Sequence, residues 1–426
     1  MIDITLVIRN VRELVNPADD TVVRGERLNS LRLSRNVWVG AQGENIRFVG
    51  YEEDFKRNCR LAADAVEIDG SGLVAFPGLV DPHTHLPFGG TRQDEFRLKL
   101  QGVDYREIAR QGGGIKRTVA DTRAMSRDQL AMAVENRLDR MLLSGTTTCE
   151  AKSGYGLDRD TEIKQLEVID AVNEFHPVEL VPTFMGAHEI PPEYSGRNRD
   201  FIDFQVKEVM PRIRERNLAE FVDIFCEEGV FSIDEAAEYL QRAREMGFKL
   251  KIHADEFTSN GAAQLAVDMQ ARSAEHLIAM TPDEIAAISA SETACIFLPG
   301  VSFFLRLKEY APARAVIDRD GIVALGSDFN PGSSMISSQL FIFHLGVFQL
   351  GLTIEEALNA VTINAAYAVD RQASVGSLVP GKKMDVLLAD IPDYSYLAYH
   401  PGLIPWHTIV KSGEVVVQDY QPLYNR

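Results

Sequence analysis

The chain has 426 residues, with 44 Lys or Arg against 62 Asp or Glu, and therefore a formal net charge of −18. Hydrophobic residues make up 45% and charged residues 25%, which excludes a disordered or low-complexity protein. Since nucleic acids and anionic membranes bind clusters of Lys and Arg, the acidic balance also argues against both as partners. At this length we expect about two to three domains, or one large barrel with an appendage.

The cysteines and the apolar runs are typical of a cytoplasmic protein. The four cysteines lie far apart without a C-x-x-C pair, so they form neither a disulfide framework nor a thiolate metal site. The first residues, MIDITLVIRN, carry charge within their apolar run, unlike a signal peptide. The longest apolar stretch, residues 340–352, contains His344 and is too short to span a bilayer.

Short apolar runs between polar and glycine turns predict β-structure at both ends of the chain. Ser412-Gly413 is a hairpin signal between the last two runs. We expect residues 1–75 and 381–426 to form one small β-domain beside a central domain of residues 76–380. The runs are Ile4–Ile8, Val37–Gly40, Ile46–Val49, Asp385–Ala389, Thr408–Lys411 and Glu414–Gln418.

Between these ends, strands alternate with amphipathic helices that begin at recognisable caps. The capping box S/T-x-x-E/Q occurs at Ser126, Ser232, Thr281 and Thr353. After Ser126, apolar residues at helical spacing form one face, and Gly145 ends the helix. The residues of that face are Leu130, Val134, Leu138, Met141 and Leu142.

Eight segments alternate with the helices, most of them short and apolar, as expected for strands that are buried on both faces of a parallel sheet. Eight strand–helix units over about 300 residues predict a (β/α)₈ TIM barrel, in the α/β class. The alternative is an open doubly wound sheet, but no G-x-G-x-x-G follows an early strand. The segments are Leu79–His85, Thr146–Lys152, Glu179–Met185, Phe221–Glu227, Lys249–Asp255, Ser273–Leu277, Thr293–Leu298 and Ile322–Ser327.

In a barrel, the carboxyl ends of the strands form the active-site face, and polar side chains gather there in this sequence. His83 and His85 stand two residues apart at the end of the first strand, so both rings can face the barrel axis. Together with His253 and Asp328 they supply three nitrogens and one carboxylate. Such a set leaves a position open for water and suits catalytic Zn²⁺ or Fe²⁺. The alternative is a group of core histidines and an aspartate that caps a helix.

Glu256 and His276 stand beside this set. Glu256 follows His253 by three residues, where it can act on the attacking water as general base and then as proton donor. The alternative for Glu256 is an acid at the start of the next helix. His276 can stabilise an oxyanion, or it can have only a structural role behind the metal. The fourth strand ends without a lysine that could bridge two metals, and Lys152 follows the second strand instead, so we expect one metal ion.

Several motifs resemble those of a known superfamily. PGLVDPHTH, then HADE, a lone strand-end histidine and GSD look like the amidohydrolase superfamily. More narrowly, HLPFGGTRQDEF, LQGVDYREIARQGGGI, EAKSGYGL, FMGAHEIP and GSDFNPGSS resemble the imidazolonepropionase family, over the region from about Asp81 to Asp385. The resemblance implies a barrel with a small β-domain, a homodimer, and hydrolysis of the cyclic amide of 4-imidazolone-5-propanoate. The product is N-formimidoyl-L-glutamate, in histidine degradation.

The resemblance also implies roles for individual residues. One group holds a single zinc or iron ion, and a second group contacts substrate or product, while Glu256, His276 and Asp328 are the expected catalytic groups. The implied metal ligands are His83, His85, His253 and Asp328. The implied substrate contacts are Arg92, Tyr155, His188, Glu256, Asn330, Gly332 and Ser333.

These residue types suit a substrate with a carboxylate tail and a flat polar ring. Arg92 can bind a carboxylate through two hydrogen bonds, but the loop Asn330–Ser333 also offers N–H groups and a hydroxyl, so the place of the tail stays open. Tyr155 and His188 can form hydrogen bonds in the plane of the ring. The alternatives are a surface ion pair for Arg92, an interface aromatic for Tyr155 and a strand-end cap for His188. We expect Gln111–Gly114 to form a mobile lid or a turn.

Other functions stay open at this point, among them that of another cyclic amidase. A metal-dependent deaminase of the guanine or cytosine type uses the same ligands and glutamate, but it needs no group to hold a carboxylate. Arg92 and the loop 330–333 therefore favour the cyclic amidase, in which Asp328 or Glu256 takes the proton of the attacking water. A non-catalytic metal protein on the same scaffold would lack one of the ligands or Glu256, and all of them are present.

Overall fold

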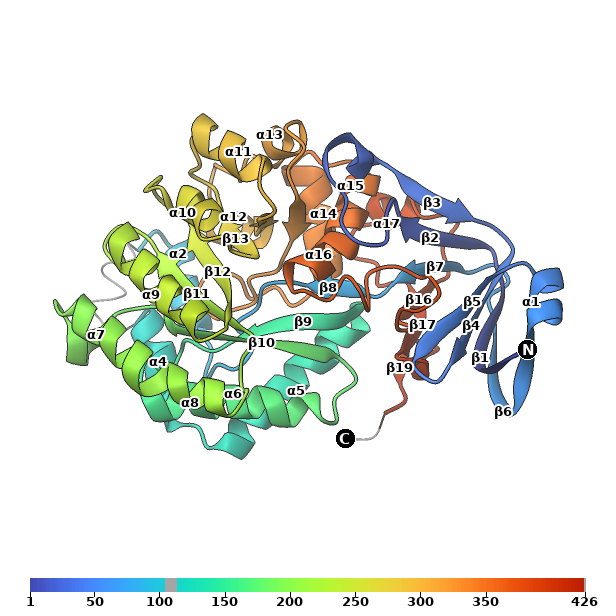
Figure 1. Ribbon diagram of the computed structural model, residues 1–426, viewed down its shortest axis with the longest axis horizontal. Helices are drawn as coiled ribbons and strands as arrows, with labels where there is room; N and C mark the ends of the chain where they lie inside the picture. Colours follow the sequence, from blue (N-terminus) through green and yellow to red (C-terminus); the bar gives the residue numbers. More distant parts are fainter. Residues whose placement is uncertain (104–112, 425–426) are drawn as a thin grey trace.

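An eight-stranded parallel sheet forms the centre of the computed structural model, which describes residues 1–103 and 113–424. Each strand pairs with the next one in chain order, as the strand–helix repeat predicts. Beyond the first and last strands, Thr84 bridges Phe329, and the His85 amide donates to the Phe329 carbonyl at 3.1 Å. The sheet thus closes into the predicted barrel (Figure 1). Its strands are β8 (Leu79–Asp81), β9 (Thr146–Lys152), β10 (Glu179–Ala187), β11 (Phe221–Cys226), β12 (Lys249–Ala254), β13 (Ser273–His276), β14 (Ala294–Phe297) and β15 (Val323–Leu325).

The first strand is shorter than the sequence pattern indicates. β8 ends at Asp81 and not at His85, because Pro82 has no N–H with which to continue the ladder. The histidines beyond it are nevertheless held in place, since the amide of Asp328 donates to the carbonyl of His83 at 3.0 Å. Backbone hydrogen bonds outside the regular strands therefore fix both segments.

Helices cover the outside of the barrel (Figure 1), and four of them begin at the predicted caps. The four predicted capping boxes are present, with reciprocal hydrogen bonds at each. In α5 the predicted apolar residues are those that are buried, so the predicted face is the one that packs inward. The helices in this region are α2 (Gln93–Leu100), α4 (Ile115–Ala124), α5 (Arg127–Leu143), α6 (Arg159–Asn173), α7 (Asn198–Phe204), η3 (Gln205–Val209), α8 (Met210–Glu215), α9 (Ile233–Glu245), α10 (Ala262–Asp268), α11 (Pro282–Ser289), α12 (Pro299–Leu305), α13 (Ala313–Ile317), α14 (Gln339–Gln349), α15 (Ile354–Ala360) and α16 (Ile363–Ala368).

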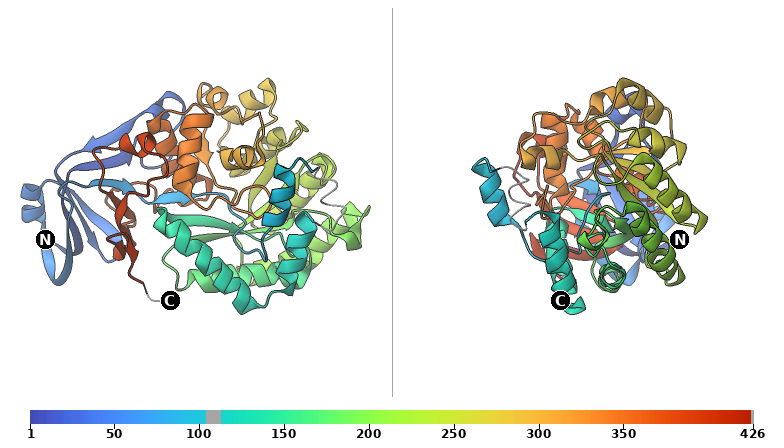
Figure 2. Two further views of the ribbon diagram at one scale, coloured as in Figure 1. Left: turned by 180° about the vertical axis from the view of Figure 1, so that it is seen from behind. Right: turned by 90° about the vertical axis from the view of Figure 1, so that its left-hand side faces the viewer.

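Two smaller sheets lie together at one end of the molecule, beside the barrel (Figure 1, Figure 2). One has the order β5-β4-β1-β6 and the other β19-β18-β17-β16-β7-β2-β3. β16 pairs antiparallel with β7, so both parts of the chain contribute to one sheet, as expected. The domain limits at residues 75 and 380 stay a prediction. The strands are β1 (Ile2–Val11), β2 (Glu13–Pro17), β3 (Leu31–Ser34), β4 (Val37–Gln42), β5 (Asn45–Gly50), β6 (Cys59–Asp69), β7 (Val74–Pro77), β16 (Val386–Ala389), β17 (Trp406–Lys411), β18 (Glu414–Gln418) and β19 (Gln421–Pro422), with short helices η1 (Gly25–Asn29), α1 (Glu52–Asn58), η2 (Pro192–Tyr194) and α17 (Tyr396–Tyr399) elsewhere in the chain.

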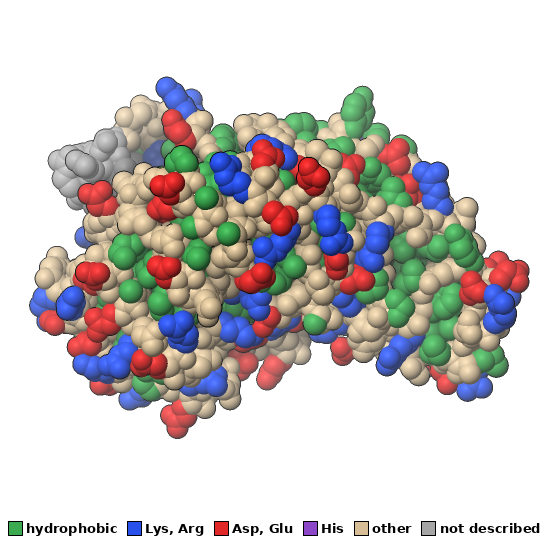
Figure 3. Space-filling model, turned by 45° about the horizontal axis from the view of Figure 1, so that its top comes forward, with side chains coloured by type: hydrophobic (Ala, Val, Ile, Leu, Met, Phe, Trp, Pro, Cys, Tyr) green, Lys and Arg blue, Asp and Glu red, His purple; other side chains and the backbone are tan. Residues whose placement is uncertain are grey.

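Charges of both signs are mixed on the surface. Figure 3 shows Asp and Glu side chains interspersed with Lys and Arg over one face of the molecule. The net charge of −18 is therefore not gathered into a single acidic patch on that face. None of the helices in the described part of the chain combines the length and the apolar character that crossing a membrane requires.

The turn after α5 packs tightly against the seven-stranded sheet. Gly145 has φ +97°, and a Cβ atom there would lie 2.6 Å from Nε1 of Trp406. Gly72 has a similar φ of +83°, but a Cβ atom would meet no atom within 4 Å among the described residues. Both glycines thus have a left-handed φ, but only at Gly145 would a Cβ atom collide with a neighbouring side chain.

We expect Gly145→Ala to lower the free energy of unfolding by about 1–3 kcal/mol more than Gly72→Ala does. Both substitutions place an L-residue in the left-handed region and both restrict the unfolded chain, so those costs cancel in the comparison. Denaturant unfolding of the two variants beside the wild type measures the difference. Equal losses would show that Trp406 moves aside without cost.

Candidate metal centre and active site

A cavity of about 590 Å³ opens at the carboxyl ends of the barrel strands, where the sequence predicts the active site. Every predicted site residue except His83 lines it, and His83 is fully buried behind it. The structure therefore brings together residues that lie as much as 250 positions apart in the chain. The predicted residues that line the cavity are His85, Arg92, Tyr155, His188, His253, Glu256, His276, Asp328, Asn330, Gly332 and Ser333.

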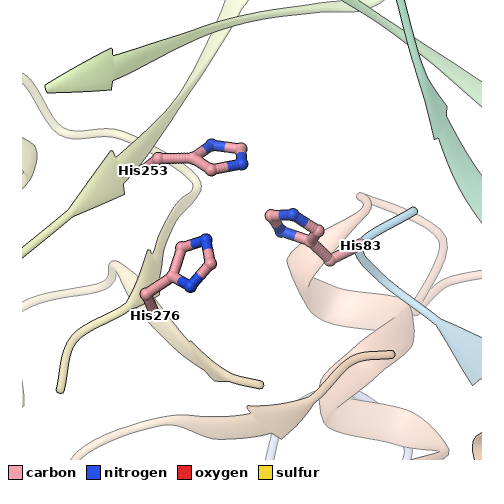
Figure 4. Close-up of side chains that lie close together, drawn as sticks. All are labelled: His83, His253 and His276. Carbon is pink, nitrogen blue, oxygen red and sulfur yellow. The ribbon is translucent and has the colours of Figure 1, made fainter. Parts of the chain in front are cut away.

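The predicted metal ligands converge on one point. His83 Nε2 and His85 Nε2 lie 3.2 and 3.3 Å from the same oxygen, Oδ1 of Asp328. Donor atoms of His83, His253 and His276 also lie within 4.8 Å of one another, and Figure 4 shows the three rings facing a common space. His276, expected to act on the substrate, is thus as close to the ligand group as the predicted ligands are.

Two of these residues have an unusual backbone conformation. His276 has φ +71° and Asp328 has φ +49°, both in the left-handed region that most residues avoid. Each such residue costs about 1–2 kcal/mol, so the surrounding structure must hold it there. Asp328 is held by its amide, which donates to the carbonyl of His83.

Unpaired nitrogens show that the group fits a cation. Within the described chain, Nε2 of His253 is buried without a hydrogen-bond partner, and the contact between His83 Nε2 and Asp328 lacks hydrogen-bond geometry. A buried imidazole nitrogen left without a partner is costly unless it binds something. Lone pairs of neutral imidazoles beside a carboxylate are the donor set that zinc and iron prefer.

The buried charges near the ligands also leave room for a divalent ion. Among the carboxylates and lysines that are ion-paired to the ligands or to one another, four buried carboxylates stand against two buried lysines, so with neutral imidazoles the balance is 4 − 2, or two negative charges in excess. A bound divalent cation would neutralise this excess, as buried charges require. The carboxylates are Glu150, Asp223, Glu275 and Asp328, and the lysines are Lys152 and Lys251.

Burial keeps the histidines of the cavity neutral. It lowers the pKa of His85 to about 4 and the pKa of His188 and of His276 to about 3. A neutral ring keeps a lone pair that can bind a metal or accept a hydrogen bond. At neutral pH these three rings are therefore ligands or hydrogen-bonding groups and not cations.

The two carboxyl groups of the site differ in protonation. Burial raises the pKa of Asp328, but the adjacent His83 and His85 outweigh it and hold that pKa well below its ordinary value. Burial raises the pKa of Glu256 well above its ordinary value, and the charges of Asp328 and Glu227 add to the effect. Two carboxyl groups with opposed pKa shifts are the arrangement that separates an anionic group from a proton donor. Glu256 Oε2 lies 3.6 Å from Nε2 of His276.

The two candidate sites for a carboxylate tail are in fact adjacent. A Cβ atom on Gly332 would lie 2.6 Å from Nη1 of Arg92, so the guanidinium lies against the loop. The amides of Gly332 and Ser333 both donate to Oδ1 of Asn330 at 2.8 Å, which occupies them within the loop. Arg92 is only 8% exposed and its Nε donates to Glu95 at 2.9 Å, so it is no surface ion pair.

The aromatic side of the cavity is built from Tyr155, His188 and His85. His188 and His85 stack with ring centroids 4.9 Å apart, and the Tyr155 ring lies 5.1 Å from His188. Nδ1 of His188 lies 3.0 Å from the carbonyl of Gly154, a contact that requires a proton on Nδ1 and leaves Nε2 as an acceptor. Burial raises the pKa of Tyr155, so its hydroxyl remains a donor.

Sequence reasoning missed several residues that line the cavity. Lys99, whose Nζ donates to the carbonyl of Gly332 at 3.3 Å, lies in the last turn of α2, and Arg92 is the residue that precedes this helix. Glu189 follows His188 directly, but no pattern distinguishes the apolar members. Of the predicted lid at residues 111–114, Gln111 and Gly112 lie outside the described residues. The missed residues are Lys99, Ile115, Glu189, Phe225, Phe257 and Leu305.

The chain is similar to known proteins over nearly its whole length. The model of the amidohydrolase family matches residues 74–417. Imidazolonepropionase of Bacillus cereus strain G9842 is 44% identical over 411 residues, which cover 96% of both chains. Imidazolonepropionase of Bacillus anthracis strain CDC 684 / NRRL 3495 is similar to the same extent.

Solved structures share the fold at low sequence identity. An adenosine deaminase from Xanthomonas campestris with bound zinc has a TM-score of 0.72 at 17% identity, over 100% of this chain and 95% of that one. Atrazine chlorohydrolase from Arthrobacter aurescens TC1, complexed with zinc, has a TM-score of 0.68 at 17% identity, over 99% and 97%. Because the chain is 44% identical to the Bacillus proteins over nearly its full length, it belongs to the imidazolonepropionase family of amidohydrolases.

Proposed function

We propose that the cavity binds 4-imidazolone-5-propanoate and that the residues around it hydrolyse its cyclic amide to N-formimidoyl-L-glutamate. The chain is a hydrolase of histidine degradation, which its 44% identity to the Bacillus imidazolonepropionases supports. The observation that carries the proposal is the single cavity in which a group of metal-binding residues, a proton donor and a buried arginine meet. A deaminase would have no use for that arginine.

The substrate's carboxylate is proposed to bind Arg92, with Lys99 beside it. The Gly332 and Ser333 amides are already occupied by Asn330, and this favours the guanidinium over the loop as the anion site. With the tail held there, the flat ring would lie against Tyr155 and His188, which offer one donor and one acceptor.

One zinc or iron ion is proposed to be held by His83, His85, His253 and Asp328. Their unpaired nitrogens and the excess of two buried negative charges support a divalent ion. When bound, the ion supplies Lewis acidity and a water of lowered pKa. Lys152 supports a single ion, because its Nζ contacts Asp223, Glu150 and Glu275 at 2.7–3.0 Å and is not available as a ligand.

Proton transfer is proposed to run through Asp328 and Glu256. The low pKa of Asp328 leaves it ionised and able to take the proton of the attacking water. The water oxygen forms a bond with the ring carbonyl carbon, and the bond between that carbon and the ring nitrogen then breaks. Glu256, whose raised pKa keeps it protonated, gives its proton to the leaving nitrogen, and His276 faces the developing oxyanion. Asp328 returns the proton to Glu256.

A cytoplasmic homodimer completes the proposal. The resemblance to the superfamily supports the dimer, and the absence of paired cysteines in the sequence supports a reducing compartment.

The wild-type protein should consume 4-imidazolone-5-propanoate, and the loss of the substrate's ultraviolet absorbance measures this reaction. A chelator should abolish the loss and lower the melting temperature, because a metal that binds the folded state stabilises it, and Zn²⁺ or Fe²⁺ should restore both. His344→Gln should keep both the activity and its sensitivity to the chelator, since His344 is a buried histidine bonded to the Leu397 carbonyl outside the cavity. No absorbance loss by the metal-loaded protein contradicts the proposed reaction.

Glu256→Gln should reduce kcat by about 10²–10⁴-fold, as expected for a lost acid–base group. Metal content should not change, because Glu256 is not proposed as a ligand. The comparison is with Glu238→Gln, an exposed glutamate of α9, which should retain full activity. Near-normal turnover of Glu256→Gln would remove Glu256 from the mechanism.

Arg92→Gln should raise KM far more than it lowers kcat, because the guanidinium binds a part of the substrate that does not react. With the carboxamide analogue of the substrate, wild type and variant should differ little. Arg97→Gln, an exposed arginine on the same helix, controls for general loss of positive charge. If the variant discriminates between acid and amide as strongly as the wild type, the tail binds elsewhere.

A further inference from the structure

A network of buried charges lies directly behind the metal-binding residues. It consists of Glu150 and Lys152 on β9, Asp223 on β11, Lys251 on β12 and Glu275 on β13, and each of these side chains is 0% exposed. Lys152 Nζ lies 2.8 Å from Glu150, 2.7 Å from Asp223 and 3.0 Å from Glu275. Lys251 Nζ lies 2.9 Å from both Glu150 and Glu275.

Glu275 is the member that joins this network to the ligands. Its Oε2 lies 2.6 Å from Nδ1 of His83 and 3.5 Å from Nδ1 of His253, while its Oε1 lies 2.9 Å from Lys251. Since Lys152 and Lys251 contact its two oxygens, Glu275 is not free to be a ligand itself. Its Oε2 therefore lies within hydrogen-bonding distance of Nδ1 of His83 and directs its negative charge at both imidazoles.

We propose that Glu275 is a positioning residue whose negative charge, counted against Lys152 and Lys251, sets the affinity of the site for a divalent cation. This inference rests on the proposed metal centre. With Glu275 charged and the imidazoles neutral, the network and Asp328 together carry 4 − 2, an excess of two negative charges. Without that charge the excess falls to one, and the two lysines then oppose an incoming cation more strongly.

Two substitutions separate the charge of Glu275 from its geometry. Glu275→Gln keeps the size of the side chain and removes the charge, whereas Glu275→Asp keeps the charge and shortens the side chain. Glu275→Gln combined with Lys251→Met removes one charge of each sign and returns the excess to two. Glu356→Gln is the matched control, because Glu356 is also a buried, ion-paired glutamate, but its cationic partner is Arg314.

The measurement is the dissociation constant for Zn²⁺, obtained by titrating the metal-free proteins against a chromogenic chelator. We expect Glu275→Gln to weaken binding by about 10–100-fold, the range found when groups behind metal ligands are removed. Glu275→Asp and Glu356→Gln should stay close to the wild type, and the double variant should bind more tightly than Glu275→Gln. Circular dichroism of each metal-free variant verifies that it is folded.

The outcomes distinguish the two levels of the proposal. If the wild type does not bind Zn²⁺, the proposed metal centre is wrong. If the wild type binds Zn²⁺ and Glu275→Gln binds it equally well, or if Glu275→Asp is as weak as Glu275→Gln, the charge of Glu275 does not set the affinity. The pair of single variants decides this even if the double variant does not fold.

Discussion

The closure of the barrel between its first and last strands is the interaction on which the rest of the site depends. Two backbone hydrogen bonds, from the Asp328 amide to the His83 carbonyl and from the His85 amide to the Phe329 carbonyl, join segments about 245 residues apart. These bonds bring the carboxylate of Asp328 within 3.2–3.3 Å of the rings of His83 and His85. Neither segment belongs to a regular strand, so local strand propensity alone would not hold them together.

The site concentrates features that are costly for a folded protein. His276 and Asp328 adopt left-handed backbone conformations, and among the described residues imidazole nitrogens are buried without hydrogen-bond partners. Three carboxylates and two lysines are buried beneath them. Isolated buried charges and strained residues persist only where the surrounding structure determines their positions, and such sites commonly serve function. The closely packed barrel and the helices around it supply that support.

Much of this structure could be predicted from the sequence, because the signals were local. Caps such as Ser126 and the apolar spacing after it depend only on neighbouring residues, and the eight strand segments were short apolar runs between such helices. The candidate ligands could be predicted because strand ends in a barrel point to one face. The family resemblance added the substrate.

The features that could not be predicted depend on which residues meet across the barrel. Pro82 ended β8 early, although the predicted strand continued to His85. Glu275 stands beside His276 in the sequence and has no signal of its own, since only the fold brings Lys152 and Lys251 to it. The closeness of Arg92 to Gly332 likewise depends on two loops that are 240 residues apart in the sequence and meet only in the fold.

The pairing of β7 with β16 has a consequence for synthesis on the ribosome. The two strands are separated by more than 300 residues, which take roughly 15–60 s to translate at 5–20 residues per second. During that time β7 has an unpaired edge of the kind that other chains can join. The nascent chain must therefore keep this edge covered or rely on chaperones until the last strands emerge. The seven-stranded sheet is therefore completed late in folding, although β7, one strand of this pair, is translated early.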